Sequence, residues 1–186
     1  TDRKLVNFEN YPHTARGHWL PSFTAHTNAE SINAIKGDFL GESINPDSHL
    51  FMQDVAFNSF PFYFTFRMYW GDKNQNIDQM LEEFYTLFYG PARAQMKAFY
   101  AYCEAHHPDM RKNKEKADRA LALFAEAREQ VEEGSIYDKR LALLGDYLEG
   151  LAARSKQIAK EQQRKHAPEL RTWRRAHSVE IDGNLD

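Results

Sequence analysis

Two amphipathic helices are predicted on either side of Gly90, with almost no loop between them. The apolar positions recur every three or four residues before Gly90 (Ile77, Leu81, Phe84, Phe88) and after it (Ala92, Met96, Phe99, Cys103). Gly90 suits a left-handed backbone position just past a helix end. Pro91 suits the first turn of the next helix, where its missing N–H costs no hydrogen bond. We therefore expect a tight corner between two helices at this point.

The C-terminal half carries the same apolar spacing in two longer segments. The first covers residues 110–133, and the second begins at Ser135, a predicted N-cap, with Asp138 near the positive end of the helix dipole. Two long helices joined by a two-residue connection must fold back as an antiparallel hairpin. The second helix is on the order of 40 Å long. We therefore predict a helical bundle domain over residues 76–175.

The N-terminal part of the chain alternates between short apolar runs and one helical segment. Short strands are predicted at residues 4–8, 18–23 and 38–44, and a helix at residues 28–36, opened by an asparagine N-cap. Strand, helix and strand with short connections form a βαβ unit. Three short strands cannot close a sheet alone, so we expect this part to complete a larger α/β structure. The fold class is thus mainly α with an N-terminal α/β part.

Residues 51–70 hold the densest group of aromatic side chains and admit two interpretations. A strand is favoured by the alternation of Phe60, Phe62, Phe64 and Phe66. A helix is favoured by the stripe Phe51, Val55, Phe62, Phe66 and Tyr69. Because the segment is longer than a typical strand, we predict a helix, with Pro61 as a kink or a new first turn. The next helix is predicted to open at Asn76, with Gln79 completing a capping box.

The composition fits a globular protein and sets few limits on function. Of 186 residues, 42% are hydrophobic and 27% are charged. The net charge of −3 gives no electrostatic reason to expect nucleic acid or an anionic membrane as a partner. No apolar run is long enough to span a bilayer. Cys103 is the only cysteine, so an internal disulfide is excluded, and its apolar stripe predicts a buried thiol.

Candidate chemistry is sparse. The eight histidines lack the i, i+4 spacing of a helical zinc site, so we predict no metal and no cofactor. Glycosidases need two carboxylates, which in an α/β barrel come from the C-terminal ends of strands. Glu42 is the only acid near the C-terminal end of a predicted strand, and His26 follows the predicted strand at residues 18–23. Together with Trp19, these two are the candidate substrate-binding residues. A surface or helix-cap role is the alternative, and no catalytic residue is assigned.

The stretch around the Gly90 junction resembles a known family. The residues that carry the resemblance are Tyr69-Trp70-Gly71-Asp72, Asn76-Ile77-Asp78, Glu83-Phe84-Tyr85, Phe88-Tyr89-Gly90-Pro91-Ala92 and Met96-Lys97-Ala98-Phe99-Tyr100. They are similar to a bacterial domain of unknown function in large, secreted, α-glucuronidase-like proteins of polysaccharide-degrading bacteria. The resemblance covers residues 17–105. It implies that residues 1–75 are the C-terminal part of a TIM-like barrel, and that the location is periplasmic or extracellular.

The last residues carry a second resemblance. The run Glu180-Ile181-Asp182-Gly183-Asn184-Leu185-Asp186 is similar to the opening strand of a β-sandwich carbohydrate-binding module. Residues 176–186 are therefore expected to start a following β-domain. Only its opening is present, so no sugar-binding residue can be assigned there.

Three hypotheses for function follow. The first is the C-terminal portion of a secreted, glycoside-hydrolase-like protein that acts on polysaccharides or glycans, with carbohydrate as partner through the parent protein. In that case the fragment is catalytically incomplete, and its acids lie upstream of Thr1. The second is a non-enzymatic helical interaction or structural module. The third, an intact small enzyme, is the weakest because no acid pair or nucleophile arrangement is evident.

Overall fold

The structure is a computed structural model that describes residues 5–10, 23–35, 39–44, 51–71 and 75–166. Over these ranges the chain is mainly helical, as the sequence predicts. Its elements are β1 (Leu5–Asn10), α1 (Ala25–Ile35), β2 (Phe39–Ile44), α2 (Phe51–Trp70), α3 (Ile77–Tyr89), the 3₁₀ turn η1 (Gly90–Ala92), α4 (Arg93–His106), the 3₁₀ turn η2 (Asp109–Arg111), α5 (Lys114–Arg128) and α6 (Ile136–His166).

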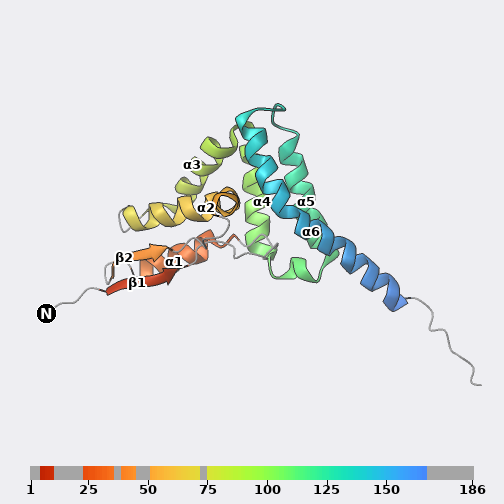
Figure 1. The fold of residues 1–186 in the computed structure, drawn as a ribbon, viewed down its shortest axis with the longest axis horizontal. Coiled ribbons are helices and arrows are strands. Elements are labelled where there is room, and N and C mark those ends of the chain that lie inside the picture. The colour runs from red at the N-terminus through yellow and green to blue at the C-terminus, as the bar shows by residue number, and fades with distance from the viewer. Residues whose placement is uncertain (1–4, 11–22, 36–38, 45–50, 72–74, 167–186) are drawn as a thin grey trace, which may run out of the picture.

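The elements form an N-terminal group and a helical group (Figure 1). Strands β1 and β2 lie side by side near α1, whereas α4, α5 and α6 run alongside one another. Helix α6 extends well beyond its neighbours toward the C-terminal end. Helix α2 contacts α1, α3 and α6, and it therefore joins the N-terminal group to the helical one.

Strands β1 and β2 pair in parallel, with α1 between them along the chain. The register places Leu5 opposite Phe39 and Asn7 opposite Glu42. The predicted strand at residues 18–23 lies outside the described residues apart from its last position. Helix α1 begins at Ala25 and not at the predicted Asn28, whose N–H donates to the carbonyl of Thr24 (2.9 Å).

Residues 51–70 form one helix, so the helical interpretation is confirmed and the strand is excluded. The buried stripe, however, differs from the predicted one: Phe60, Phe64 and Met68 are buried, whereas Phe66 is 48% exposed. Two aromatic stripes compete on this helix, and the side that faces α3 and α4 is the one whose rings contact Phe84 and Tyr100. Packing partners distant in sequence decide which stripe is buried.

The corner between α3 and α4 forms as predicted. Helix α3 opens with the Asn76 side chain accepting from the Gln79 N–H (3.0 Å) and ends at Tyr89. Gly90 follows with φ +51°, and its N–H donates to the carbonyl of Thr86. Pro91 lies in the 3₁₀ turn η1 that leads into α4. The chain therefore reverses within three residues.

The predicted α5–α6 hairpin forms, but its connection is longer than two residues. Helix α5 begins after Asn113, whose side chain accepts from the Lys116 N–H (3.1 Å), and it ends at Arg128 and not at residue 133. Residues 129–135 form the connection. The Ser135 hydroxyl accepts from the Asp138 N–H (3.1 Å), which confirms Ser135 as the N-cap of α6. Val131 lies in this connection and packs against the buried cluster. Its apolar side chain continues the helical spacing of α5, which is why the predicted helix extended too far.

Nearly all the buried apolar residues that the structure describes belong to a single cluster, which reaches from Phe23 to Leu151. At its centre the hydroxyls of Tyr89 and Tyr100 are hydrogen-bonded to each other (2.7 Å), which satisfies both polar groups away from water. Burial raises the pKa of both phenols, and the hydrogen bond between them lowers that of Tyr89 and raises that of Tyr100. Cys103 is fully buried, as predicted, and burial raises the pKa of its thiol.

One buried hydroxyl interrupts the apolar seam between α5 and α6. Ser155 is 4% exposed and donates a hydrogen bond to Asp118, which also pairs with Lys114. Burial disfavours the charged form of Asp118, but the hydrogen bonds from Lys114 and Ser155 outweigh it and lower the pKa of this carboxyl. The seam therefore contains a polar contact whose groups are all satisfied.

Candidate functional site

The structure places the three predicted site residues differently. Trp19 lies outside the described residues. Glu42 lies inside β2, opposite Asn7, because the strand continues to Ile44. Only His26 has a described side chain, and it is the second residue of α1 and not part of a loop.

His26 lies between two carboxylates that are distant from it in the sequence. Its Nδ1 is 2.8 Å from Oε2 of Glu104 on α4, and its Nε2 is 3.2 Å from Oδ1 of Asp78 in the first turn of α3. The backbone N–H of His26 also donates to Oε1 of Glu104 (3.0 Å). One side chain from α1 is thus connected to both α3 and α4.

This geometry favours the protonated form of the His26 ring, in which both ring nitrogens donate a hydrogen bond. A carboxylate only accepts, so both ring nitrogens donate when His26 is protonated. The hydrogen bond to Glu104 raises the pKa of His26 most, burial lowers it, and the contact with Asp78 raises it further. Neither nitrogen is left to take a proton from a substrate. The cluster therefore attaches α1 to the bundle rather than acting as a general base.

We expect the attachment of α1 to weaken as His26 loses its proton. The folded state holds the proton more tightly than the unfolded chain, because the folded-state pKa is raised from 6.5. The stabilisation is therefore fully present below pH 6.5 and is lost as the pH rises through the raised pKa. Because His26 is half exposed, the loss in the free energy of unfolding should be at most about 1 kcal/mol. Urea unfolding at a series of pH values measures it.

The control for this prediction is His107, whose pKa is shifted in the direction opposite to that of His26. Burial, with Arg111 nearby, lowers the pKa of His107, so its titration favours folding as the pH rises. The variant His26→Gln should remove the loss of stability above neutral pH, whereas His107→Gln should retain it. An unchanged pH profile in His26→Gln would show that this cluster is not the cause.

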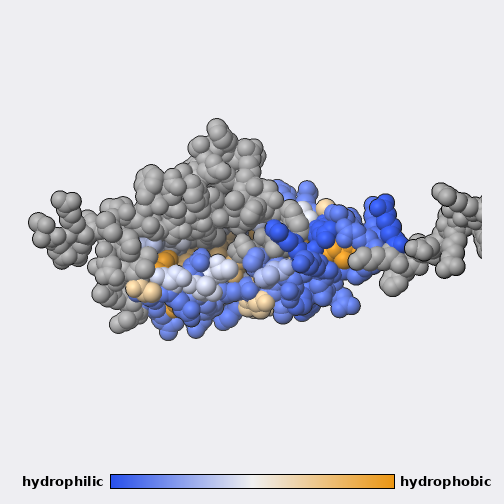
Figure 2. All heavy atoms as spheres, turned by 90° about the horizontal axis from the view of Figure 1, so that it is seen from below, coloured by the Kyte–Doolittle hydropathy of each residue, from blue (hydrophilic) through white to orange (hydrophobic). Residues whose placement is uncertain are grey.

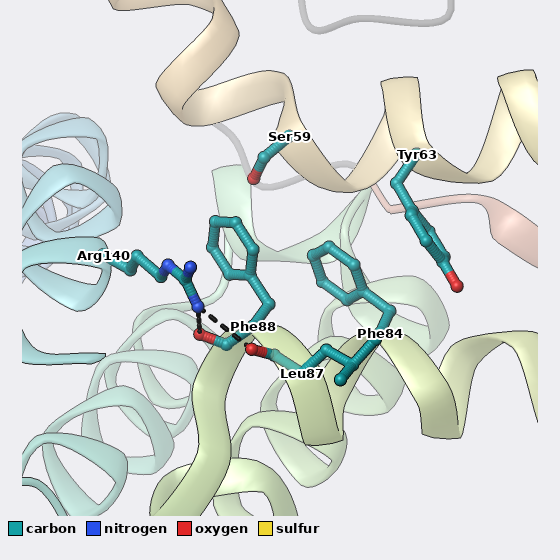
Figure 3. A pocket seen from close by; sticks show the side chains of 6 residues that line it. All are labelled: Ser59, Tyr63, Phe84, Leu87, Phe88 and Arg140. Carbon is teal, nitrogen blue, oxygen red and sulfur yellow. Dashed lines mark hydrogen bonds between the residues drawn. The ribbon is translucent and has the colours of Figure 1, made fainter. Parts of the chain in front are cut away.

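A pocket of about 310 Å³ lies between α2, α3 and α6 (Figure 3). Its wall is mainly aromatic and aliphatic, and its polar groups are two hydroxyls and a guanidinium. The lining residues are Ser59, Tyr63, Phe84, Leu87, Phe88 and Arg140. The Tyr63 hydroxyl points away from the centre (Figure 3), and it accepts from Arg67 and donates to the carbonyl of Met80. The pocket thus presents ring faces at one side and polar groups at the other.

Arg140 closes one end of this pocket. Its Nη1 donates to the carbonyls of Leu87 (3.0 Å) and Phe88 (2.9 Å) at the end of α3. Its guanidinium carbon lies 4.6 Å from the ring centre of Phe88, a cation–π distance. The pocket was missed from the sequence because Ser59, Phe88 and Arg140 come from three helices, and no spacing along the chain connects them.

Among the described residues, a further hollow lies at the C-terminal end of α2. It has a volume of about 290 Å³ and is lined by Phe66, Arg67, Trp70 and Gly71. Trp70 is 89% exposed, and Arg67 is paired with Glu83 (2.9 Å). Elsewhere, the described side chains on the face seen in Figure 2 are mainly hydrophilic, with small apolar areas between them.

The described residues contain no group of three or more His, Cys, Asp or Glu side chains placed to hold a metal ion. None of the helices that the structure describes is both long and apolar enough to cross a membrane.

Comparison with known proteins gives no relative for this chain. No family model, curated protein or solved structure matches it. The resemblance to α-glucuronidase-like proteins therefore stays a prediction from the residues that carry it.

Proposed function

We propose that this chain is the C-terminal portion of a secreted, glycoside-hydrolase-like protein that acts on polysaccharides or glycans. In this proposal residues 1–75 are the last part of a TIM-like barrel, and the helical bundle follows it. Carbohydrate is the partner of the parent protein, and the described residues supply no complete active site of their own.

The observation that carries this proposal is the parallel pairing of β1 with β2. Parallel strands occur almost always inside larger sheets whose two faces are covered by helices. Within the described residues the sheet has two strands, and a two-stranded sheet is marginal by itself. Further parallel strands from a parent barrel would complete it, and α1 has the place of a crossover helix in such a fold.

The bundle supports the same proposal as a rigid continuation of the barrel. Its core is continuous with the buried residues of α1 and α2, among them Ala29, Ile32 and Phe60. A barrel helix that shares its core with a following domain keeps that domain in a fixed position. The bundle would thus hold a subsequent domain at a set distance from the barrel.

The complete reading frame that encodes this chain tests the proposal. We expect it to contain further strand–helix units before Thr1, to bind at least one polysaccharide on a glycan array, and to release sugar from it. The chain of 186 residues alone should release none. A complete protein that binds no glycan would leave the carbohydrate assignment without a basis.

One observation favours a second candidate, a helical module that binds a protein partner. Leu87, Ile136 and Leu143 are exposed aliphatic side chains, and Ile136 and Leu143 are two turns apart on α6. Arg140, between them, is bonded to the end of α3 that carries Leu87. If this face binds a partner, Leu87→Glu with Leu143→Glu should abolish co-purification of that partner with the complete protein and leave glycan binding unchanged.

A further inference from the structure

We propose that the pocket between α2, α3 and α6 binds a small molecule with a carboxylate attached to a six-membered ring. In this complex the carboxylate is held by Arg140 and Ser59, and the ring lies against the aromatic wall formed by Phe84 and Phe88. The site is separate from any barrel active site, so the proposal does not depend on the carbohydrate assignment.

The Arg140 guanidinium presents an unoccupied edge to the pocket. Its Nη1 is used by the carbonyls of Leu87 and Phe88, but its Nε and Nη2 donate to no other residue that the structure describes. These two N–H groups form one side of the planar guanidinium and match the two oxygens of a carboxylate. No described carboxylate occupies this edge, whereas Arg67, Arg119, Arg128 and Arg154 each pair with an acid.

The Ser59 hydroxyl adds a second donor. It points toward the ring of Phe88 and the guanidinium of Arg140 (Figure 3). It makes no hydrogen bond with another described residue. A half-buried hydroxyl beside a half-buried cation can therefore complete the binding of one anionic group.

The chemistry of the pocket selects a carboxylate over a phosphate or a cation. A phosphate carries close to two negative charges at neutral pH and usually needs more than one cation, whereas Arg140 is the one charged residue of the lining. The Leu87 and Phe88 carbonyls already neutralise part of its charge, which suits a monoanion. A cationic ligand would be repelled by the guanidinium.

The apolar wall defines the rest of the ligand. Phe84, Leu87 and Phe88 offer ring faces and a methyl-bearing edge, and the Phe84 and Phe88 rings are stacked (5.1 Å between centres, 13° between planes). A volume of about 310 Å³ is at the small end of the range for ligand pockets. One six-membered ring with its carboxylate fits within this volume, and both an aromatic acid and a sugar acid present such a ring.

Capping of α3 explains only part of this arrangement. Nη1 of Arg140 satisfies two carbonyls at a helix end, which is a structural role. It leaves the Nε–Nη2 edge, the Ser59 hydroxyl and the concave aromatic wall unexplained. A lysine or a water could satisfy the same carbonyls without forming a planar fork beside a pocket.

Titration of the ¹⁵N-labelled full chain tests the proposal by NMR. The probes are benzoate and galacturonate as the two kinds of ring carboxylate, with benzamide and galactose as their uncharged counterparts. We expect at least one acid to shift the amide signals of Ser59, Leu87 and Phe88. Its uncharged counterpart should bind more weakly by about tenfold or a larger factor. The tighter acid identifies the source of the ligand as aromatic or sugar.

Two variants and one control assign the binding to the pocket. Arg140→Lys keeps the charge but loses the fork, so affinity should fall about fivefold or more. Ser59→Leu fills the pocket without touching the end of α3 and should abolish binding, which keeps the test valid if Arg140→Lys is poorly folded. Arg164→Lys, on the exposed far part of α6, should bind like the parent chain. Binding by neither acid, or equal binding in Ser59→Leu, would overturn the proposal.

Discussion

Replacement of Gly90 by alanine should lower the free energy of unfolding by about 2–5 kcal/mol, through backbone strain and overpacking together. Gly90 has φ +51°, which L-residues rarely adopt. A Cβ at this position would also lie 2.5 Å from Cζ of Tyr137 at the start of α6. A side chain at position 90 is therefore disfavoured for two reasons: the backbone conformation and the Tyr137 ring that covers the corner.

Double-mutant analysis separates these two causes. Tyr137→Ala in the Gly90→Ala background removes the steric overlap but leaves the backbone strain, so it should restore part of the lost stability. Gly145→Ala is the matched control, because its Cβ would lie 3.5 Å from the Phe124 ring in ordinary contact and its position is helical. It should be neutral or stabilise by about 0.5–1 kcal/mol. Urea unfolding measures these three variants and Tyr137→Ala alone, which completes the cycle. A Gly90→Ala variant as stable as the parent would contradict the geometry.

Truncation of Phe60 should destabilise the chain by about 3–5 kcal/mol. The Phe60 ring is 3% exposed and lies within ring-contact distance of side chains from all sides of the N-terminal core: Phe23, Phe64, Phe84, Tyr85 and Tyr100. Phe60→Ala therefore opens a cavity where α2 meets α3 and α4. The adjacent rings belong to rigid helices and can close it only in part.

Phe66→Ala is the control for this prediction. It removes the same atoms from the same helix, but Phe66 is half exposed, so its loss should change stability by less than about 1 kcal/mol. Thermal unfolding of the two variants compares them directly. Equal losses would mean that Phe66 contributes as much to the core as Phe60, which would contradict its exposure.

Local backbone chemistry made parts of the fold predictable. The corner at Gly90 and Pro91, the Asn76 cap and the Ser135 cap each depend on residues within one turn, and each forms as expected. The start of α5 was missed, although Asn113 is a good N-cap, because apolar spacing continued across the preceding turn. Apolar spacing alone does not show whether an apolar residue packs on the core from a helix or from a loop.

Contacts between distant segments were not predictable from the sequence. The two aromatic stripes of α2 are chemically alike, and only the position of α3 and α4 decides that Phe66 faces outward. His26 was selected as a candidate, but Asp78 and Glu104 are 52 and 78 positions away from it. The signal that could have suggested the pocket was Arg140, a cation placed among apolar positions of α6.

The start of α1 depends on a residue from another helix. Glu104 accepts from the His26 N–H in the position that a local N-cap side chain would take, so the first turn of α1 is completed only when α4 is present. The N-terminal segment and the bundle should accordingly melt as one cooperative unit. In hydrogen exchange, the first amides of α1 should become unprotected together with those at the end of α4.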